Sequence, residues 1–155
     1  MPVDNNTLIG PEISPDGKRI AVDRTVQGAR DVWLMDLVRG RATRFTFDPG
    51  IDGYPVWSPD GTQIVFESNR KGNFDIYVGS SSNPGQERVV LEAPENQWPY
   101  DYSKDGKFLL HWDGANASDL WALPLTEKDA KPIPIATTPA LEPNGAFSPD
   151  THWVA

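Results

Sequence analysis

The stretch Ser58-Pro59-Asp60-Gly61 is one of four copies of a short signal in this 155-residue chain. The other copies begin at Ser14, Ser103 and Ser148, so consecutive copies start 44, 45 and 45 residues apart. A constant period of this size indicates an array of equivalent supersecondary units. Repeat scaffolds of this kind mostly serve binding, so the period also bears on function.

Each copy of the signal lies between two apolar segments. In the second copy Trp57 precedes the Ser, and Ile64 and Val65 follow at the sixth and seventh positions after it. Asp-Gly between apolar runs is a strong hairpin signal, because a type I′ turn needs positive φ at both central residues. Each copy is therefore predicted to be a type I′ hairpin between a first and a second strand.

Two further strands follow each hairpin. A third strand is predicted at 31–35, 75–78 and 119–123, each starting with an Asp, and a fourth at 43–47, 87–91 and 132–136. Pro134 has no N–H for a ladder, so the fourth strand is predicted to be a sheet edge. An Asp that recurs once per repeat indicates a structural acceptor for backbone N–H groups or a neighbouring loop.

Four antiparallel strands in about 45 residues, repeated along the chain, predict an all-β fold of β-propeller blades. The repeats run over 14–57, 58–102 and 103–147, and a half-blade follows at 148–155, so we expect one partial propeller of about three and a half blades. A β-sandwich is the main alternative, but it does not require matching strands every 45 residues. No helical stripe of useful length occurs.

Residues 57–78 carry a family resemblance. Aromatic-Ser-Pro-Asp-Gly, Ile-Val-Phe-Glu-Ser-Asn-Arg and Asp-Ile-Tyr-Val in this stretch resemble the repeat of TolB-like (WD-type) propellers. Similar repeats occur in propellers of tricorn-type and prolyl-oligopeptidase-type peptidases, and 141–155 resembles C-terminal propeller regions of some bacterial serine/threonine protein kinases. The resemblance implies the fold and leaves function open, because this propeller accompanies unrelated activities. Lys104 and Thr151 depart from the motif, and Thr151 weakens the last hairpin because a β-branched residue disfavours positive φ.

An open arc of blades would expose broad apolar faces on its first and last blades, so the ring is expected to close. The resemblance implies six blades, and propellers in general have four to eight. Two copies with three blades each would close a six-bladed ring with two-fold symmetry, with 144–155 of one copy beside 10–22 of the other. We therefore expect a homo-oligomer. The alternative is an excised fragment whose half-blade helps to cover one end.

Composition limits the partners. The net charge of −8 and the absence of a basic stripe argue against nucleic acid. Without cysteine the chain has no disulfide and no thiolate chemistry, and it has no apolar stretch long enough to span a membrane. The start, residues 1–6, lacks the character of a signal peptide. A periplasmic or extracytoplasmic location is expected for the parent family.

A catalytic site is not expected. His111 replaces Val22 and Phe66 of the other repeats and is predicted to pack, while His152 lies beside a turn and is predicted to be exposed. Neither follows a nucleophile motif. Residues 101–106 imitate the opening of a calcium loop, but Trp112 stands where a bidentate Glu is needed. We therefore predict a non-enzyme without cofactor or metal.

Binding is predicted on the connections between the fourth strand and the next first strand, because loops vary while blades stay fixed. Acidic and aromatic residues there suit a protein or peptide partner with basic character. The candidates are Asp48, Asp52, Tyr54, Glu95, Trp98, Tyr100, Glu142 and Asn144. Glu12 and Asp101 are candidate channel-lining residues. A purely structural role, in which Trp98 and Tyr100 plug the channel mouth, is the alternative.

Two functions remain open on the sequence. The first is a non-enzymatic propeller scaffold for protein or peptide interaction that assembles from partial rings. The second is a portion of the sensor or gating propeller of a larger enzyme, either a peptidase or a bacterial serine/threonine kinase.

Overall fold

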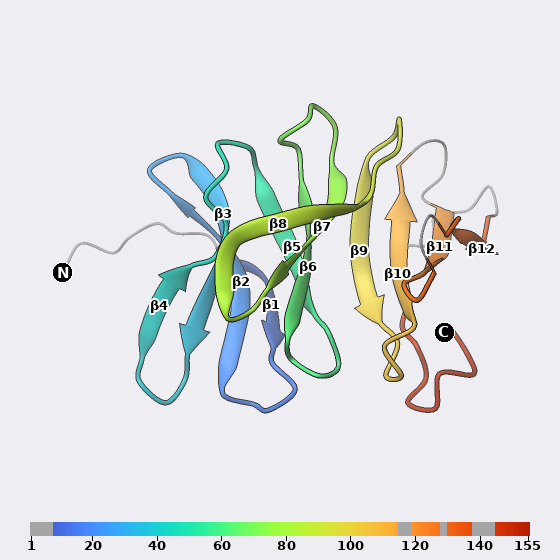
Figure 1. The fold of residues 1–155 in the computed structure, drawn as a ribbon, viewed down its shortest axis with the longest axis horizontal. Coiled ribbons are helices and arrows are strands. Elements are labelled where there is room, and N and C mark those ends of the chain that lie inside the picture. The colour runs from blue at the N-terminus through green and yellow to red at the C-terminus, as the bar shows by residue number, and fades with distance from the viewer. Residues whose placement is uncertain (1–7, 115–118, 128–129, 138–144) are drawn as a thin grey trace.

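A computed structural model describes residues 8–114, 119–127, 130–137 and 145–155, and Figure 1 shows its fold. The described residues form three four-stranded antiparallel sheets, with neighbours in the orders β1-β2-β3-β4, β5-β6-β7-β8 and β9-β10-β11-β12. The all-β partial propeller is confirmed. The strands are β1 Leu8–Ile13, β2 Arg19–Val26, β3 Ala29–Asp36, β4 Arg41–Arg44, β5 Asp52–Trp57, β6 Gln63–Ser68, β7 Asp75–Ser80, β8 Asn83–Leu91, β9 Gln97–Tyr102, β10 Phe108–Asp113, β11 Asp119–Pro124 and β12 Ile133–Ala136.

We call these sheets blades 1, 2 and 3. The first strand of each blade ends just before the Ser of the motif. The repeats predicted from the sequence begin at that Ser, so each one starts in the turn between the first and second strands of a blade. The fourth strands, β4, β8 and β12, each pair with only one neighbour, which confirms them as sheet edges. A half-blade hairpin, residues 145–155, follows blade 3 and contains the bridge between Phe147 and Val154.

The recurring turns differ from the predicted type I′ geometry. A type I′ turn needs positive φ at the Asp and at the Gly. In the second copy Gly61 has a φ of 71°, but Asp60 does not have a positive φ. The Gly61 N–H donates to the Ser58 carbonyl over 2.9 Å, which is the hydrogen bond of a type I turn with Pro at its second position. The type I′ assignment is therefore wrong. Pro59, whose φ is fixed near −65°, favours this turn, and the third copy adopts the same hydrogen bond with Lys104 at that position.

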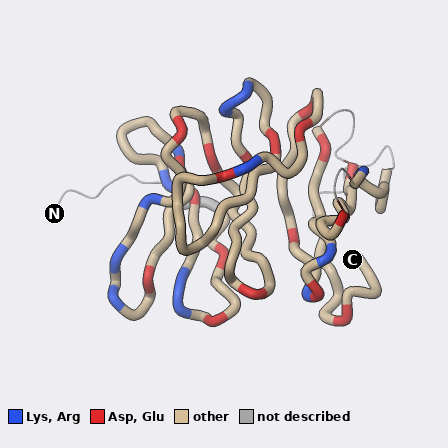
Figure 2. The backbone as a smooth tube through the Cα atoms, in the orientation of Figure 1, with Lys and Arg blue, Asp and Glu red and all other residues tan. Residues whose placement is uncertain are grey.

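Side chains complete each turn. The Ser58 hydroxyl donates to Asp60 over 2.6 Å and accepts from the Gln63 N–H, while the Asp60 carboxylate accepts from the Thr62 N–H. A hydrogen bond from the Ser hydroxyl is the largest cause that lowers the pKa of the Asp in all four turns, and a backbone N–H adds to it in each. The turns lie along one edge of the arc, where Figure 2 shows acidic segments.

The fourth turn keeps this geometry despite its substitution. The Thr151 N–H donates to the Ser148 carbonyl over 2.9 Å, and Thr151 takes a φ of 59°. A β-branched residue is strained in that region, so the weakness predicted for this hairpin has a visible backbone cause.

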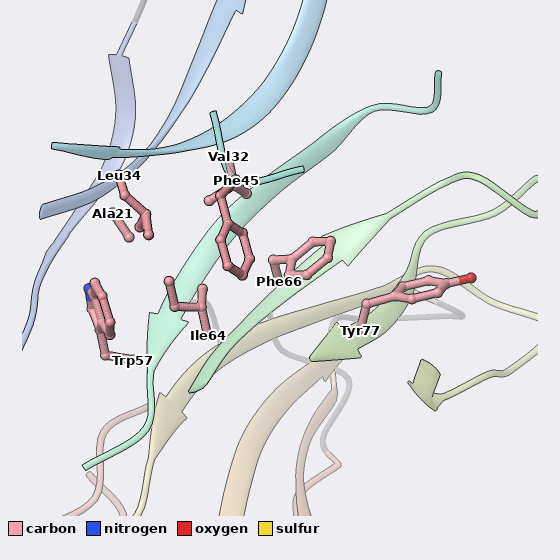
Figure 3. Close-up of a cluster of buried hydrophobic side chains, with 8 residues drawn as sticks. All are labelled: Ala21, Val32, Leu34, Phe45, Trp57, Ile64, Phe66 and Tyr77. Carbon is pink, nitrogen blue, oxygen red and sulfur yellow. The ribbon is translucent and has the colours of Figure 1, made fainter. Parts of the chain in front are cut away.

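Buried side chains pack between the blades rather than within one sheet. Ala21, Val32, Leu34 and Phe45 of blade 1 and its following loop meet Trp57, Ile64, Phe66 and Tyr77 of blade 2 (Figure 3). A second cluster joins blades 2 and 3 through aliphatic residues such as Val65, Val78 and Leu109. Phe147 and Val154 of the half-blade hairpin pack against a third cluster on blade 3. Consecutive blades therefore cover one another's faces.

Candidate binding groove on the innermost strands

A groove of about 190 Å³ runs across the first strands of all three blades. These strands are the innermost of the arc, since β5 contacts both β1 and β9. Each carries a register shift next to a proline, and this edge has no further strand to pair with, so proline is tolerated there. The lining residues are Gly10, Pro11, Glu12, Tyr54, Pro55, Val56, Pro99 and Tyr100.

Tyr54 is the most prominent side chain in the groove. It is 42% exposed and has a φ of 49°, an uncommon value for a residue other than glycine. The Arg30 guanidinium lies over its ring at 5.4 Å from the centroid. Tyr100 lies in the same groove, and burial first and Tyr54 second raise the pKa of its hydroxyl. Two tyrosines from different blades therefore present aromatic surface to one groove.

The two channel-lining candidates have different environments. Glu12 lines the groove, and no hydrogen bond to its carboxylate occurs among the described residues. Burial, and secondarily Asp101, raise its pKa. Asp101 instead accepts the Phe147 N–H at 2.7 Å and the Tyr102 N–H at 2.9 Å. Asp101 therefore holds the half-blade hairpin, and Glu12 is the acidic group of the groove.

Two of the loop candidates, Asp48 and Asp52, lie beside the Arg70 guanidinium within the chain. The Arg70 guanidinium lies 3.3 Å from Asp52, 3.5 Å from Glu87 and 4.0 Å from Asp48, and the ring of Tyr77 lies beneath it at 4.4 Å. Asp52 is completely buried, and burial raises its pKa although hydrogen bonds from Ser68 and Thr46 oppose the shift. Asp48 and Asp52 therefore stabilise the connection that carries Tyr54.

A second arginine site, which sequence reasoning missed, joins blades 1 and 2. Arg30 of β3 is paired with Asp23 of β2 and lies 3.6 Å from Glu67 of β6. Burial raises the pKa of Glu67 to about 8, with Arg30 opposing the shift. A Cβ at Gly53 would lie 2.5 Å from Arg30, so this position needs glycine for the close approach. The family motif in residues 57–78 includes Arg70, and no sequence signal pointed to Arg30.

The remaining loop candidates have structural contacts or lie outside the described residues. The Trp98 ring is stacked on Phe74, at 6.5 Å, and lies tilted against Trp112, at 4.9 Å. Glu95 is exposed, and its backbone carbonyl accepts from the Asn73 amide. Glu142 and Asn144 lie outside the described residues. Of the six loop candidates that the structure describes, Tyr54 and Tyr100 line the groove.

Two of the three recurrent Asp residues, Asp31 and Asp75, have structural partners. Asp31 accepts from Arg44 at 2.7 Å, and Asp75 accepts the Ala93 N–H at 3.2 Å, so each ties its third strand to a neighbouring strand or loop. His152 is exposed beside its turn, as predicted.

His111 is buried, which confirms that it packs, and burial lowers its pKa to about 4. Its two ring nitrogens are buried without a hydrogen bond. Within the described part of the chain, no group of three or more His, Cys, Asp or Glu is arranged to hold a metal ion, and no helix is long and apolar enough to cross a membrane.

Comparison with known proteins places this geometry in a family. A family model described as the TolB beta propeller domain matches residues 4–155. The Tol-Pal system protein TolB of Francisella tularensis is 34% identical over 90 residues, which are 56% of this chain and 20% of that protein. The uncharacterized peptidase YuxL of Bacillus subtilis is 28% identical over 110 residues, which are 67% of this chain and 17% of that protein.

A solved structure agrees with the fold. The crystal structure of TolB from Acinetobacter baumannii superimposes with a TM-score of 0.78 at 24% identity, over 94% of this chain and 36% of that one. The matched regions thus span between about a sixth and a little over a third of these proteins.

Proposed function

This chain belongs to the TolB beta-propeller family, and on that premise we propose that it is a non-enzymatic scaffold that binds a protein or peptide. The groove on the innermost strands is its proposed binding surface. One observation carries the proposal: Tyr54 and Tyr100, from different blades, line the same groove with three prolines and the carboxylate of Glu12. Tyrosines in a pre-formed groove supply large contact area at low conformational cost.

The backbone around Tyr54 supports a binding role. Tyr54 keeps a strained φ and a large exposed fraction, although its neighbours Asp52 and Gly53 are buried. Strain of this kind costs on the order of 1 kcal/mol or more and persists where the surroundings impose it. Two arginines surround this position, because Arg70 pairs with Asp52, two residues before Tyr54, and Arg30 lies over the Tyr54 ring.

A peptide selection tests the proposal. Random peptides displayed on phage are panned against the chain, and recovered peptides are measured by fluorescence anisotropy against Tyr54→Asn and Tyr100→Ala. Asn tolerates positive φ, so the first variant removes the ring without adding strain. We expect each variant to weaken binding at least tenfold. The control Phe47→Ala removes an exposed aromatic ring outside the groove and should leave affinity unchanged. Equal loss in all three variants would contradict the assignment of the groove.

We further propose that two copies complete a ring. Trp153 is 74% exposed and stands five residues after its Ser, and Ile13 is 61% exposed and directly precedes its Ser. Within the chain the residues at these two positions meet across a blade interface, as Arg19 and Trp57 do at 4.7 Å. Trp153 of one copy is therefore suited to cover Ile13 of another.

Light scattering tests this assembly. The expected mass is twice the 17.2 kDa of one chain, and Trp153→Lys should shift it toward the single-chain value. A wild-type chain that stays at 17.2 kDa at every concentration would exclude the two-copy ring.

The second candidate is a segment of a sensor or gating propeller in a larger enzyme, a peptidase or a bacterial serine/threonine kinase. The likeness to YuxL, named a peptidase, favours this reading, because this chain matches only 17% of that protein. Further blades of the same polypeptide would then cover Ile13 and Trp153. Light scattering distinguishes the two candidates. If this chain is a segment of a larger enzyme, the longer parent chain should have the mass of a monomer, and its groove should still bind peptide.

A further inference from the structure

The interface between blades 1 and 2 is closed by an arginine that crosses it. The Arg19 guanidinium of blade 1 lies 4.7 Å from the centroid of the Trp57 ring. It donates to the Ser81 carbonyl over 3.0 Å and to the Gly61 carbonyl over 3.4 Å, both in blade 2. Aromatic surface and two carbonyl oxygens therefore form a complete site for one guanidinium. We call this the guanidinium site of the first interface.

The same repeat positions form the wall of a cavity at the next interface. Tyr102 takes the place of Trp57, and Gly106 takes the place of Gly61. Leu125 takes the place of Ser81. The Ser81 N–H donates to the Thr62 carbonyl, and the Leu125 N–H donates to the equivalent carbonyl of Lys107. Tyr102 lines two pockets, of about 290 and 490 Å³, that meet at this ring, and Gly106 and Leu125 each line one of them.

The space arises from two smaller side chains. Gln63 replaces Arg19, and Val90 packs against the second cluster where the fully buried Phe45 fills the first interface. Gln63 lines both pockets, and its side-chain amide has no hydrogen bond among the described residues. The second interface thus keeps the ring and the carbonyl-bearing residues of a guanidinium site and lacks the guanidinium.

The polar groups around the cavity point to a ligand. Tyr102 is 91% buried (9% exposed), and its hydroxyl has no hydrogen-bond partner in the described part of the chain. Asp60 and Asp105 lie on the wall of the larger pocket, and their carboxylates are held ionised because Ser hydroxyls lower their pKa. Lys104 lies in the larger pocket and Arg88 in the smaller one.

We propose that the cavity between blades 2 and 3 binds an alkylguanidinium group, with the planar cation on the Tyr102 ring and the alkyl chain along Val65 and Val78. The group comes from a free small molecule or from an arginine side chain of a partner. A cation over an aromatic face combined with carbonyl acceptors is the chemistry that Arg19 already uses. This site is separate from the groove of the innermost strands, so it does not depend on the peptide-binding function.

Titration by NMR with butylguanidinium tests the proposal, with neutral butylurea as the matched isostere. We expect saturable shifts at the Tyr102 and Gly106 amides and at least tenfold weaker binding of butylurea. The tripeptide acetyl-Gly-Arg-Gly-amide tests the second source: binding of the free ion alone assigns a small molecule, and binding of the peptide assigns a partner side chain. Absence of saturable shifts with both probes would overturn the proposal.

Two variants locate the binding. Gln63→Arg supplies the missing guanidinium from the chain and should weaken butylguanidinium binding at least tenfold. Arg19→Gln empties the first interface and should create a second set of saturable shifts at Trp57 and Gly61. Unchanged binding in Gln63→Arg, with the variant folded by its amide spectrum, would show that the cation associates with the acidic surface and would overturn the site.

Discussion

The two blade interfaces of this chain have the same backbone and different contents. Between blades 1 and 2, Arg19, Phe45 and Phe66 fill the space, and the Phe45 and Phe66 rings meet edge to face at 6.0 Å. Between blades 2 and 3 the corresponding places hold Gln63, Val90 and His111. The first interface is closed, whereas the second contains a cavity and a buried imidazole without hydrogen bonds.

This difference separates what sets the fold from what sets the interfaces. The turn motif is satisfied in every repeat, including the one with Thr151, so strand order and spacing are the same throughout. Interface quality depends on a few side chains at the second strand and after the fourth. A repeat array can therefore vary its inter-blade contacts while its backbone stays constant.

The largest expected effect concerns the aromatic contact of the first interface. Phe66 is fully buried between Phe45 and Tyr77, so Phe66→Ala should lower the free energy of unfolding by about 3–5 kcal/mol. Urea denaturation followed by tryptophan fluorescence measures this loss. Ile135→Ala, at an exposed position of β12, should change stability by less than about 0.5 kcal/mol. A similar loss in both variants would remove the distinction between interface and surface.

Loss of the Arg30 ion pair should give the next largest decrease in the free energy of unfolding. Arg30→Met leaves the buried carboxylate of Asp23 without its cation, and breaking a fully buried pair in this way costs about 3–5 kcal/mol. Because the Arg30 side chain is partly exposed, we expect roughly 2–3 kcal/mol. Arg30→Lys should recover part of the loss. An Arg30→Met variant as stable as the wild type would show that the Asp23 carboxylate needs no cation.

Glu67 should give the first interface a characteristic pH dependence. Its pKa of about 8 in the folded chain lies above the value of 4.5 expected when unfolded, so the folded state binds more protons between these pH values. Stability should therefore fall as pH rises from about 4.5 to about 8. Urea midpoints measured across this range should decline in the wild type and decline less in Glu67→Gln. Parallel pH profiles would contradict a protonated Glu67.

His111 should give the second interface the opposite, smaller dependence. Its pKa of about 4 lies below the unfolded value of 6.5, so stability should be lost as pH falls through this range. His111→Phe places the blade 2 residue at this position and removes two buried unpaired nitrogens, so it should add about 1 kcal/mol at pH 7. Loss of stability in this variant at pH 7 would indicate that the cavity does not accommodate the larger ring.

Much of the fold could be predicted because the turn motif is local. Ser, Pro, Asp and Gly interact within five residues, so their spacing reports the strands directly. The turn type was mispredicted because Asp-Gly was weighed without the preceding Pro. The groove was found only in part, through Glu12, Tyr54 and Tyr100, since its prolines look like turn residues in a sequence. Arg19 and Arg30 were missed because their partners lie in another blade, a relation that no local pattern records.

Exchanging the two interface residues tests the central claim most directly. The Ser81 and Leu125 amides occupy equivalent positions and make hydrogen bonds of 2.9 and 2.8 Å, but only Ser81 is also held by Arg19. In the wild type, native-state hydrogen exchange should be slower at Ser81 than at Leu125. In the double variant Arg19→Gln/Gln63→Arg we predict the reverse order. An unchanged order of exchange in the folded double variant would contradict the claim that this single position closes or opens a blade interface.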